Sequence, residues 1–270
     1  MSSEQPASTA ARITPYELIL EPLESSVFPA IRTEAEQRGS DARRRDQFLL
    51  LGTVATALGE MMADDAPSEA VDEYGELLYQ GFQFWSFGRR VYLLGEDVSR
   101  ELIVGDYPMD GWILAAPPAC YLQFPRQRFW ARVAADQPFE PADGCFVVVD
   151  DTDPAPQAGA HLRVQLVLGV RTDRPGASLM SYRTDLDPYA VSRLARAPWR
   201  EGSEAFANAI PGGERMDYHT LATTSELEAL VLRAFHFLDS HPRALVPREG
   251  SDRAGESRLP WVEVRAGPAR

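Results

Sequence analysis

Residues 161–171 read HLRVQLVLGVR, and this stretch decides the fold class. From Leu162 to Val170 every second residue is leucine or valine, while His161, Arg163 and Gln165 occupy intervening positions. Alternation with a period of two is typical of a β-strand that has one buried face and one more polar face. The sequence therefore predicts a sheet in which this segment is a full-length strand.

Similar patterns surround this strand. Four more strands are predicted at residues 120–124, 128–133, 145–149 and 178–183. The segment CFVVV (145–149) is apolar on both faces, which indicates a central place in the sheet. The connections between the strands are short and contain Pro, Asp or Gly, which favours an antiparallel meander over long crossover connections.

The first third of the chain reads as helical. Thr14 and Glu17 form a capping box around Pro15, and a second helix over 24–38 ends at Gly39. Apolar residues from Phe48 to Met62 recur at helical spacing. The same spacing predicts a helix from Ser68 that Gly88 ends, and Ser225 with Glu228 opens a C-terminal helix over 225–240.

These elements predict an α+β fold, in which an N-terminal helical layer packs on an antiparallel five- to six-stranded meander sheet. The C-terminal helix is expected to cover the sheet as well. Along the chain we predict a disordered N-terminus (1–13), a helical N-terminal layer or subdomain (14–88) and an α+β domain (89–240). A mobile polar tail (241–270) with an edge strand at 261–265 is expected to follow.

Composition excludes several classes of function. The 270 residues carry a formal net charge of −13, which disfavours binding to nucleic acid or to anionic membranes. All 27 basic residues are arginine, so neither a lysine Schiff base nor a phosphate-loop lysine exists. The start of the chain lacks the pattern of a secretory signal, and two cysteines make no disulfide scaffold, so we expect a cytoplasmic protein.

The stretch FVVVDDTDP (146–154) ends an apolar strand on aspartates. In an antiparallel meander, this strand end would share one rim with the exit of the 178–183 strand. The rim would then gather five carboxylates that could hold Mg²⁺ or Mn²⁺, from Asp150, Asp151, Asp153, Asp185 and Asp187. The competing interpretation is turn chemistry, because Asp commonly bonds nearby backbone amides in turns.

The strip PPACYLQFPRQRFWARV (117–133) is the candidate partner surface. It combines residue types that dominate protein interfaces, and the candidates are Tyr121, Arg126, Arg128 and Trp130. The alternative is that Trp130 packs the sheet against the helical layer.

The helix EYGELLYQGFQFWSFG (73–88) is rich in aromatic residues. Phe82 and Trp85 could wall an apolar ligand cavity together with Trp130. Aromatic residues at helical spacing also form the seam between a helical layer and its neighbour, so a core role is the alternative.

No catalytic signature is present: the chain lacks nucleophile-elbow, dinucleotide-binding, phosphate-loop and zinc-protease motifs. We therefore predict a non-enzymatic interaction or regulatory protein that binds a protein partner and needs no cofactor. Two alternatives stay open, namely a metal-dependent hydrolase or nuclease that uses the aspartates, and a binder of a small apolar ligand.

Overall fold

The structure is a computed structural model. It describes residues 10–62, 68–104, 117–126, 128–132, 137–150, 161–171, 176–185, 219–220 and 224–266. Within these ranges no helix combines the length and the apolar character needed to cross a membrane.

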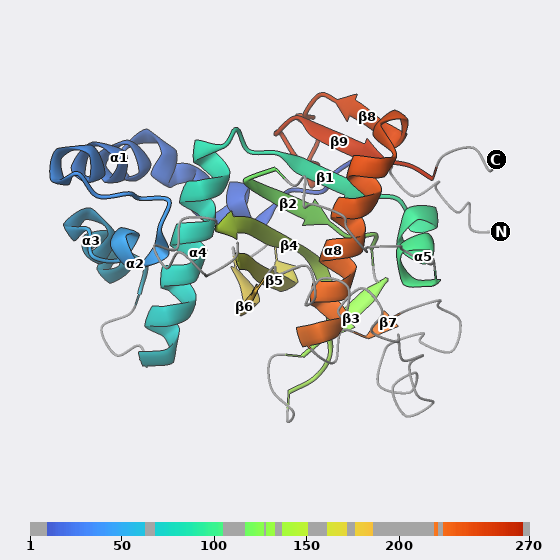
Figure 1. Ribbon diagram of the computed structural model, residues 1–270, viewed down its shortest axis with the longest axis horizontal. Coiled ribbons are helices and arrows are strands. Elements are labelled where there is room, and N and C mark those ends of the chain that lie inside the picture. Colours follow the sequence, from blue (N-terminus) through green and yellow to red (C-terminus); the bar gives the residue numbers. More distant parts are fainter. Residues whose placement is uncertain are drawn as a thin grey trace.

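A lobe of short helices begins the chain and projects beyond the rest of the molecule (Figure 1). Its elements are η1 (Tyr16–Leu20), η2 (Glu21–Ser25), α1 (Val27–Arg38), α2 (Arg45–Phe48) and α3 (Gly52–Met61). The predicted capping box is confirmed, since Thr14 donates its N–H to Glu17 Oε2 at 2.8 Å and Glu17 donates its N–H to Thr14 Oγ1 at 3.3 Å. Gly39, with φ of 63°, ends α1 as its sequence position predicted.

The helix predicted from Phe48 to Met62 is split into α2 and α3. The carboxylate of Glu34, on α1, accepts the N–H groups of Gly52 at 2.9 Å and of Thr53 at 2.8 Å. These amides belong to the first turn of α3 and lack partners inside the helix, so Glu34 stabilises a helix start at Gly52. The start of α3 is therefore set by Glu34, a residue of another helix.

Helix α4 (Ser68–Ser86) joins the lobe to the sheet. Its Phe84 ring lies 5.6 Å from the Phe146 ring of the sheet and 4.9 Å from the Tyr16 ring of η1. The aromatic residues of α4 thus form the predicted seam between the helical layer and the sheet.

The sheet has a main path of seven strands in the order β6-β5-β4-β2-β1-β9-β8. Its strands are β1 (Val91–Leu94), β2 (Ala119–Gln123), β4 (Glu140–Asp150), β5 (His161–Arg171), β6 (Gly176–Asp185), β8 (Leu245–Arg248) and β9 (Trp261–Val264). Two short strands, β3 (Phe129–Ala131) and β7 (His219–Thr220), pair beside the start of β4.

The α+β class is confirmed, but the prediction of a purely antiparallel meander is wrong because the sheet is mixed. Strand β1 lies between β2 and β9 and runs parallel to both. Helix α5 (Glu96–Val104) follows β1, so the chain can return and lay β2 beside β1 in the same direction. The strand predicted at 261–265 is present as β9, but it lies between β1 and β8 and is not an edge strand.

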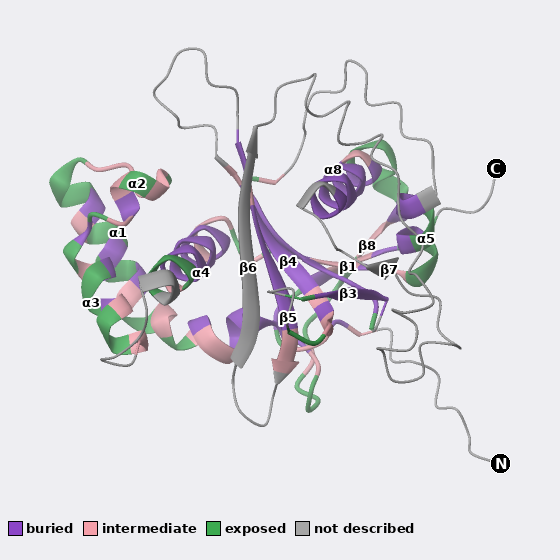
Figure 2. Ribbon diagram, turned by 90° about the horizontal axis from the view of Figure 1, so that it is seen from below, coloured by how far each residue is buried: buried purple, intermediate pink, exposed green. Residues whose placement is uncertain are grey.

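The two faces of the sheet have different covers. Figure 2 shows α4 on one face and α8 (Thr224–Ser240) on the other. Sheet residues facing α8 are mainly aliphatic residues and cysteines, among them Cys120, Leu122, Cys145 and Leu166, with Phe129 of β3 in the same cluster. Sheet residues facing α4 include the aromatic side chains of Tyr121 and Phe146.

A polar cluster lies between α4 and β5 on the α4 face. Glu76 is only 6% exposed, and its Oε2 lies 2.5 Å from Arg45 Nε and 3.8 Å from Arg163 Nη1. Its Oε1 accepts a hydrogen bond from Gln80 Nε2 at 3.0 Å. Glu76 therefore links α2, α4 and β5 through ion pairs. We call Glu76, Arg45, Arg163 and Gln80 the Glu76 cluster.

Strand β3 changes where the loops of the sheet lie. It pairs with Pro141 and Glu140 at the start of β4, while β2 pairs directly with the later part of β4. Gln123, near the end of β2, is opposite Gly144, whereas Asp150 is at the far end of β4. Pro125 and Arg126 therefore lie at the opposite end of the sheet from Asp150, whereas Asp185 lies at the same end as Asp150, since both are opposite His161.

Candidate partner-binding site

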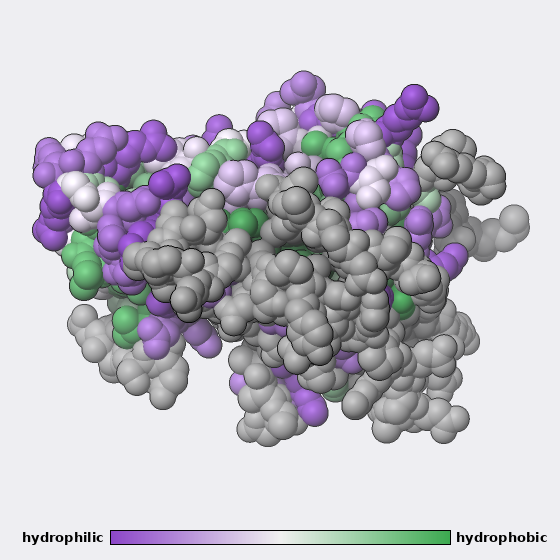
Figure 3. Space-filling model, in the orientation of Figure 1, coloured by the Kyte–Doolittle hydropathy of each residue, from purple (hydrophilic) through white to green (hydrophobic). Residues whose placement is uncertain are grey.

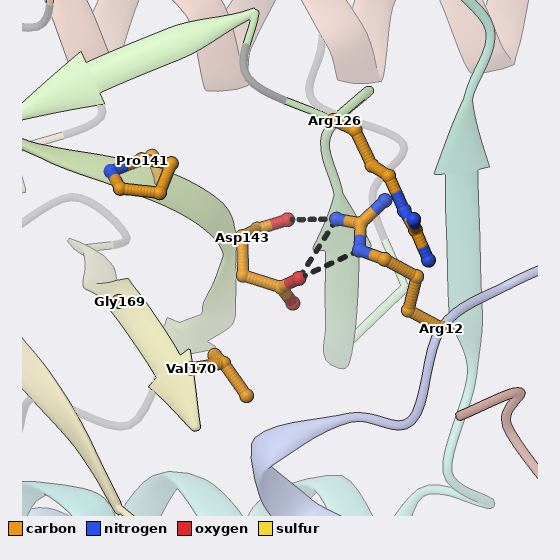
Figure 4. A pocket seen from close by; sticks show the side chains of 7 residues that line it. Arg12, Arg126, Pro141, Asp143, Gly169 and Val170 are labelled. Atoms are coloured by element: carbon orange, nitrogen blue, oxygen red, sulfur yellow. Dashed lines mark hydrogen bonds and ion pairs between the residues drawn. The ribbon is translucent and has the colours of Figure 1, made fainter. Parts of the chain in front are cut away.

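An open pocket of about 150 Å³ lies at the end of the sheet where β4 begins. Seven residues line it, and Figure 4 shows them: Arg12, Arg126, Pro141, Ala142, Asp143, Gly169 and Val170. They come from the N-terminal segment, the β2–β3 turn, β4 and β5. We call this site the Arg126 pocket.

The N-terminal segment delivers Arg12 to the pocket. Its neighbours are held by the 255–257 loop, because Ser257 donates its N–H to Ala11 O at 2.8 Å and Ile13 donates its N–H to Gly255 O at 3.2 Å. The N–H of Arg12 bonds Gln123 Oε1 at 2.8 Å. Residues 10–13 are thus paired with other segments, although they belong to the stretch predicted to be disordered. Residues 1–9 lie outside the described part of the chain.

Asp143 is the extra residue of a β-bulge in β4. The pairing with β5 runs from Ala142 opposite Leu168 to Gly144 opposite Val167, which leaves Asp143 between them. Bulges bend a strand and redirect a side chain away from the regular alternation. The bulge therefore accounts for an aspartate side chain in the pocket at the end of the sheet.

Both oxygens of the Asp143 carboxylate accept hydrogen bonds. Its Oδ1 accepts bonds from Arg12 Nε at 2.9 Å and Nη2 at 2.7 Å. Its Oδ2 accepts the hydroxyl of Tyr121 at 2.6 Å, and Gln123 Nε2 lies at 3.4 Å. Arg12 Nη2 also bonds the carbonyl oxygens of Phe124 at 2.9 Å and Asp143 at 3.1 Å. Asp143 and Arg12 therefore form a closed pair.

Tyr121 acts beneath the pocket as a hydrogen-bond donor. Burial raises the pKa of its hydroxyl well above the usual value, and the nearby charge of Asp143 raises that pKa further. The hydroxyl therefore stays protonated and acts as a hydrogen-bond donor to Asp143. A Cβ at Gly144 would overlap the carbonyl oxygen of Leu122 and would lie 2.9 Å from the Tyr121 ring, so this position needs glycine.

Arg126 is the exposed member of the pocket. Within the described residues, no hydrogen bond or ion pair joins its guanidinium to the protein. Figure 4 shows the Arg12 guanidinium between the Asp143 carboxylate and the Arg126 side chain. The pocket thus contains one neutralised cation and one cation that is open to solvent.

The other candidates for a partner surface are buried. Tyr121 is 0% exposed, Trp130 is 6% exposed and Arg128 is 9% exposed. Trp130 lies on β3, which pairs with β4 and β7. These three side chains do not form an exposed patch with Arg126, so the partner-surface prediction now depends on Arg126.

Phe82 and Trp85 are neighbours, with ring centroids 5.9 Å apart. Phe82 borders an open groove of about 260 Å³ between α1 and α4, and the Arg32 guanidinium lies 4.2 Å from the centre of the Trp85 ring. Four charged residues also line this groove: Arg32, Glu36, Asp41 and Arg43. Trp130 does not border it, so the apolar cavity imagined between the three rings does not form there.

The predicted metal residues are partly described. Asp150 and Asp185 both lie opposite His161, one on each neighbouring strand. Asp151, Asp153 and Asp187 lie outside the described residues. Among the described side chains, no group of three or more His, Cys, Asp or Glu residues could hold a metal ion. His161 was not among the predicted metal residues, although it begins β5.

The cysteines make poor nucleophiles. Cys120 and Cys145 are both buried and both free. Burial raises the pKa of each thiol above its ordinary value. A buried, protonated thiol is unreactive, so these two residues behave as small core side chains.

Comparison with known proteins adds little. No protein-family model matches the chain. No curated protein matches it either. One solved structure with similarity is "Crystal structure of AcrVA2", which is 9% identical over 90% of this chain and 79% of that chain, with a TM-score of 0.41. At that level the likeness carries no inference for this chain.

The surface of the helical lobe is mostly hydrophilic. Figure 3 shows mainly hydrophilic side chains over the helical lobe, with smaller apolar areas between them. Among the described residues, the large hydrophobic side chains that are exposed are Leu50 at 78% and Val71 at 43%. Two isolated residues do not define an apolar docking patch.

Proposed function

We propose that the chain is a non-enzymatic interaction protein that binds a protein partner at the Arg126 pocket. One observation carries this proposal: Arg126 is an exposed cation at the rim of a preformed pocket, with no partner among the described residues. Arginine is enriched where protein interfaces gain most of their binding energy. The pocket walls are also fixed, because the Arg12–Asp143 pair is held by hydrogen bonds.

The charge of the chain limits the class of partner. With a formal net charge of −13, the molecule as a whole repels nucleic acid and anionic membranes. A protein partner needs only a local match of charge and shape at the pocket. The two free buried cysteines fit a reducing compartment, so we propose that this binding takes place in the cytoplasm.

Affinity isolation of the tagged chain, followed by mass spectrometry, tests the proposal when three forms are compared. We expect the unmodified chain to retain a stoichiometric protein that Arg126→Ala loses. Arg243→Ala, which removes an exposed arginine on η4 (Pro242–Ala244), should retain it. Equal retention by both variants would contradict binding at this pocket, and crosslinks to residues 117–126 would locate the contact.

A second candidate function follows from the strand register. Asp150, His161 and Asp185 occupy adjacent positions on β4, β5 and β6, and carboxylate and imidazole are common ligands of catalytic metals. We propose a metal-dependent hydrolase as the alternative function at this end of the sheet. Titration with Mn²⁺ and with Mg²⁺, read by calorimetry, should show binding that Asp150→Asn removes. Absence of binding in the unmodified chain would eliminate the alternative.

A further inference from the structure

The hydrogen-bonding chemistry of the Arg126 pocket selects its ligand. We propose that the pocket binds a carboxylate, presented by an acidic side chain of the protein partner. This inference rests on the proposed function and adds the chemical group that the site recognises. Three features support the choice of a carboxylate. The pocket has N–H donors without partners among the described residues, its acceptors already receive hydrogen bonds, and its walls are partly apolar.

The open groups of the pocket are donors. Arg126 is exposed and makes no hydrogen bond or ion pair within the described part of the chain. Arg12 uses Nε and Nη2 for Asp143 and the backbone, and its Nη1 has no hydrogen-bond partner among the described residues. Guanidinium groups carry N–H donors and no acceptor, and their planar fork matches a carboxylate.

The acceptors of the pocket are occupied. Asp143 receives Arg12 at Oδ1 and the hydroxyl of Tyr121 at Oδ2, with the amide of Gln123 nearby. A cationic ligand would therefore find a carboxylate that is already neutralised. Among the residues that line the pocket, the remaining charge belongs to Arg126, so an anion is the favoured ligand.

The walls of the pocket fit a short aliphatic acid. Pro141, Ala142 and Val170 line it beside the two arginines, so methylene groups can pack against apolar atoms while the acid faces Arg126. The volume of about 150 Å³ accommodates one amino-acid side chain. Small-molecule sites are usually at least about 300 Å³, which makes a nucleotide or a cofactor a poor fit.

Arg12 acts as the positioning residue that keeps Arg126 available. Its guanidinium lies between Asp143 and Arg126, as Figure 4 shows, and it occupies the carboxylate that Arg126 would otherwise approach. Without Arg12, Asp143 would keep its hydrogen bond from Tyr121 but would lose its ion-pair partner, and Arg126 would be the nearest cation in the pocket lining. Asp143 and Arg126 would then pair and close the pocket.

The carboxylate of Glu140 should weaken the binding of an anion, in contrast to Arg126. A Cβ built on Gly169 would lie 2.6 Å from Glu140 Oε2, so this carboxylate lies across a residue that lines the pocket. Its charge repels an incoming anion. Removing that charge should therefore strengthen binding, whereas removing Arg126 should weaken it.

The test is an NMR titration of the full chain, followed at the backbone amides of Ala142 and Val170. The probe is glutamate capped as N-acetyl-glutamate N-methylamide, and the matched uncharged control is the capped glutamine. N-acetylglycine represents a chain-terminal carboxylate, and inorganic phosphate represents a phosphorylated partner. We expect saturable shifts with capped glutamate, none with capped glutamine, and weaker binding of N-acetylglycine and of phosphate.

Four variants separate recognition from folding. Arg126→Gln should weaken binding of capped glutamate at least about tenfold, the loss expected for a charge-assisted hydrogen bond. Glu140→Gln should tighten it. Arg12→Gln should weaken it as much as Arg126→Gln does, and the double variant Arg12→Gln, Asp143→Asn should restore part of it. A merely structural role for Arg12 predicts no restoration.

The outcomes keep this inference distinct from the proposed function. Failure of capped glutamate to bind, or tighter binding of phosphate, would overturn the carboxylate assignment even if a protein partner is isolated through Arg126. Tightest binding of N-acetylglycine would overturn the choice of a side chain as the source. Saturable binding of capped glutamate without any isolated partner would uphold the site and reject the interaction function.

Discussion

The strand residues under α8 and those under α4 form two different interiors on one sheet. Under α8 they are mainly aliphatic residues and cysteines, whereas under α4 the buried residues include Gln123 and Gln165 at 0% exposure. Arg163 lies on the same face as Gln165 and is near Glu76. Apolar packing on one face therefore leaves the other face free to hold charge. Both the Glu76 cluster and the residues beneath Asp143 belong to this second face.

The α8 face should be the more sensitive to a loss of volume. Leu166→Ala should lower the free energy of unfolding by about 3 kcal/mol, because Leu166 is fully buried and truncation leaves a cavity. Urea denaturation measures this change. Leu50→Ala is the matched control, since Leu50 is 78% exposed and should change stability by less than about 0.5 kcal/mol. Equal effects would contradict the burial assigned to Leu166.

The α4 face should be sensitive to charge. Glu76→Ala should lower the free energy of unfolding by about 2 kcal/mol, because it leaves Arg45 and Arg163 without their shared carboxylate. Asp46→Ala, which breaks the exposed pair with Arg44, should change it by less than about 0.5 kcal/mol. If Glu76→Ala proved neutral in urea denaturation, the Glu76 cluster would not stabilise the join between the layers.

A smaller effect is expected from the loss of a single hydroxyl on the α4 face. Tyr121→Phe keeps the buried ring and removes the hydrogen bond to Asp143, so it should lower the free energy of unfolding by about 1.5 kcal/mol. Urea denaturation measures this change as well. A loss as large as that of Leu166→Ala would show that the ring has also moved, and that the variant tests packing instead of the bond.

The smallest effect is expected outside both interiors, at Glu34 in the helical lobe. Hydrogen bonds from Thr53, side chain first, and from the Gly52 amide lower the pKa of Glu34 from 4.5 to about 2. A lowered pKa in the folded state gives stability that is complete above 4.5 and is lost as the pH falls toward 2. Thermal melts across this range should therefore depend less on pH in Glu34→Gln than in the unmodified chain.

Local signals predicted the helices better than the sheet. Gly39 and Gly88 end α1 and α4 as expected, because a glycine with positive φ acts within one turn. The parallel pairing of β1 with β9 joins Val91 to Trp261, and no local pattern specifies a partner so distant. Alternation reports which face of a strand is buried but carries no information about its neighbour.

The candidate site was predicted in part. Arg126 was named because it lies in a turn between two aromatic strands. Arg12 was missed because its polar surroundings resemble a disordered end, while its partners are remote in sequence. Asp143 was missed because PADG reads as a turn, although the glycine at 144 within a strand is a known sign of a bulge. That signal could have drawn attention to Asp143.

The place of β9 in the sheet has a consequence for the order of folding. During synthesis β1 can pair with β2 early, but its other side stays uncovered until residues 261–264 have left the ribosome. Contacts between such distant segments slow folding and leave a temporary strand edge that can pair with other chains. The newly made chain should therefore be most prone to aggregate just before β9 is added.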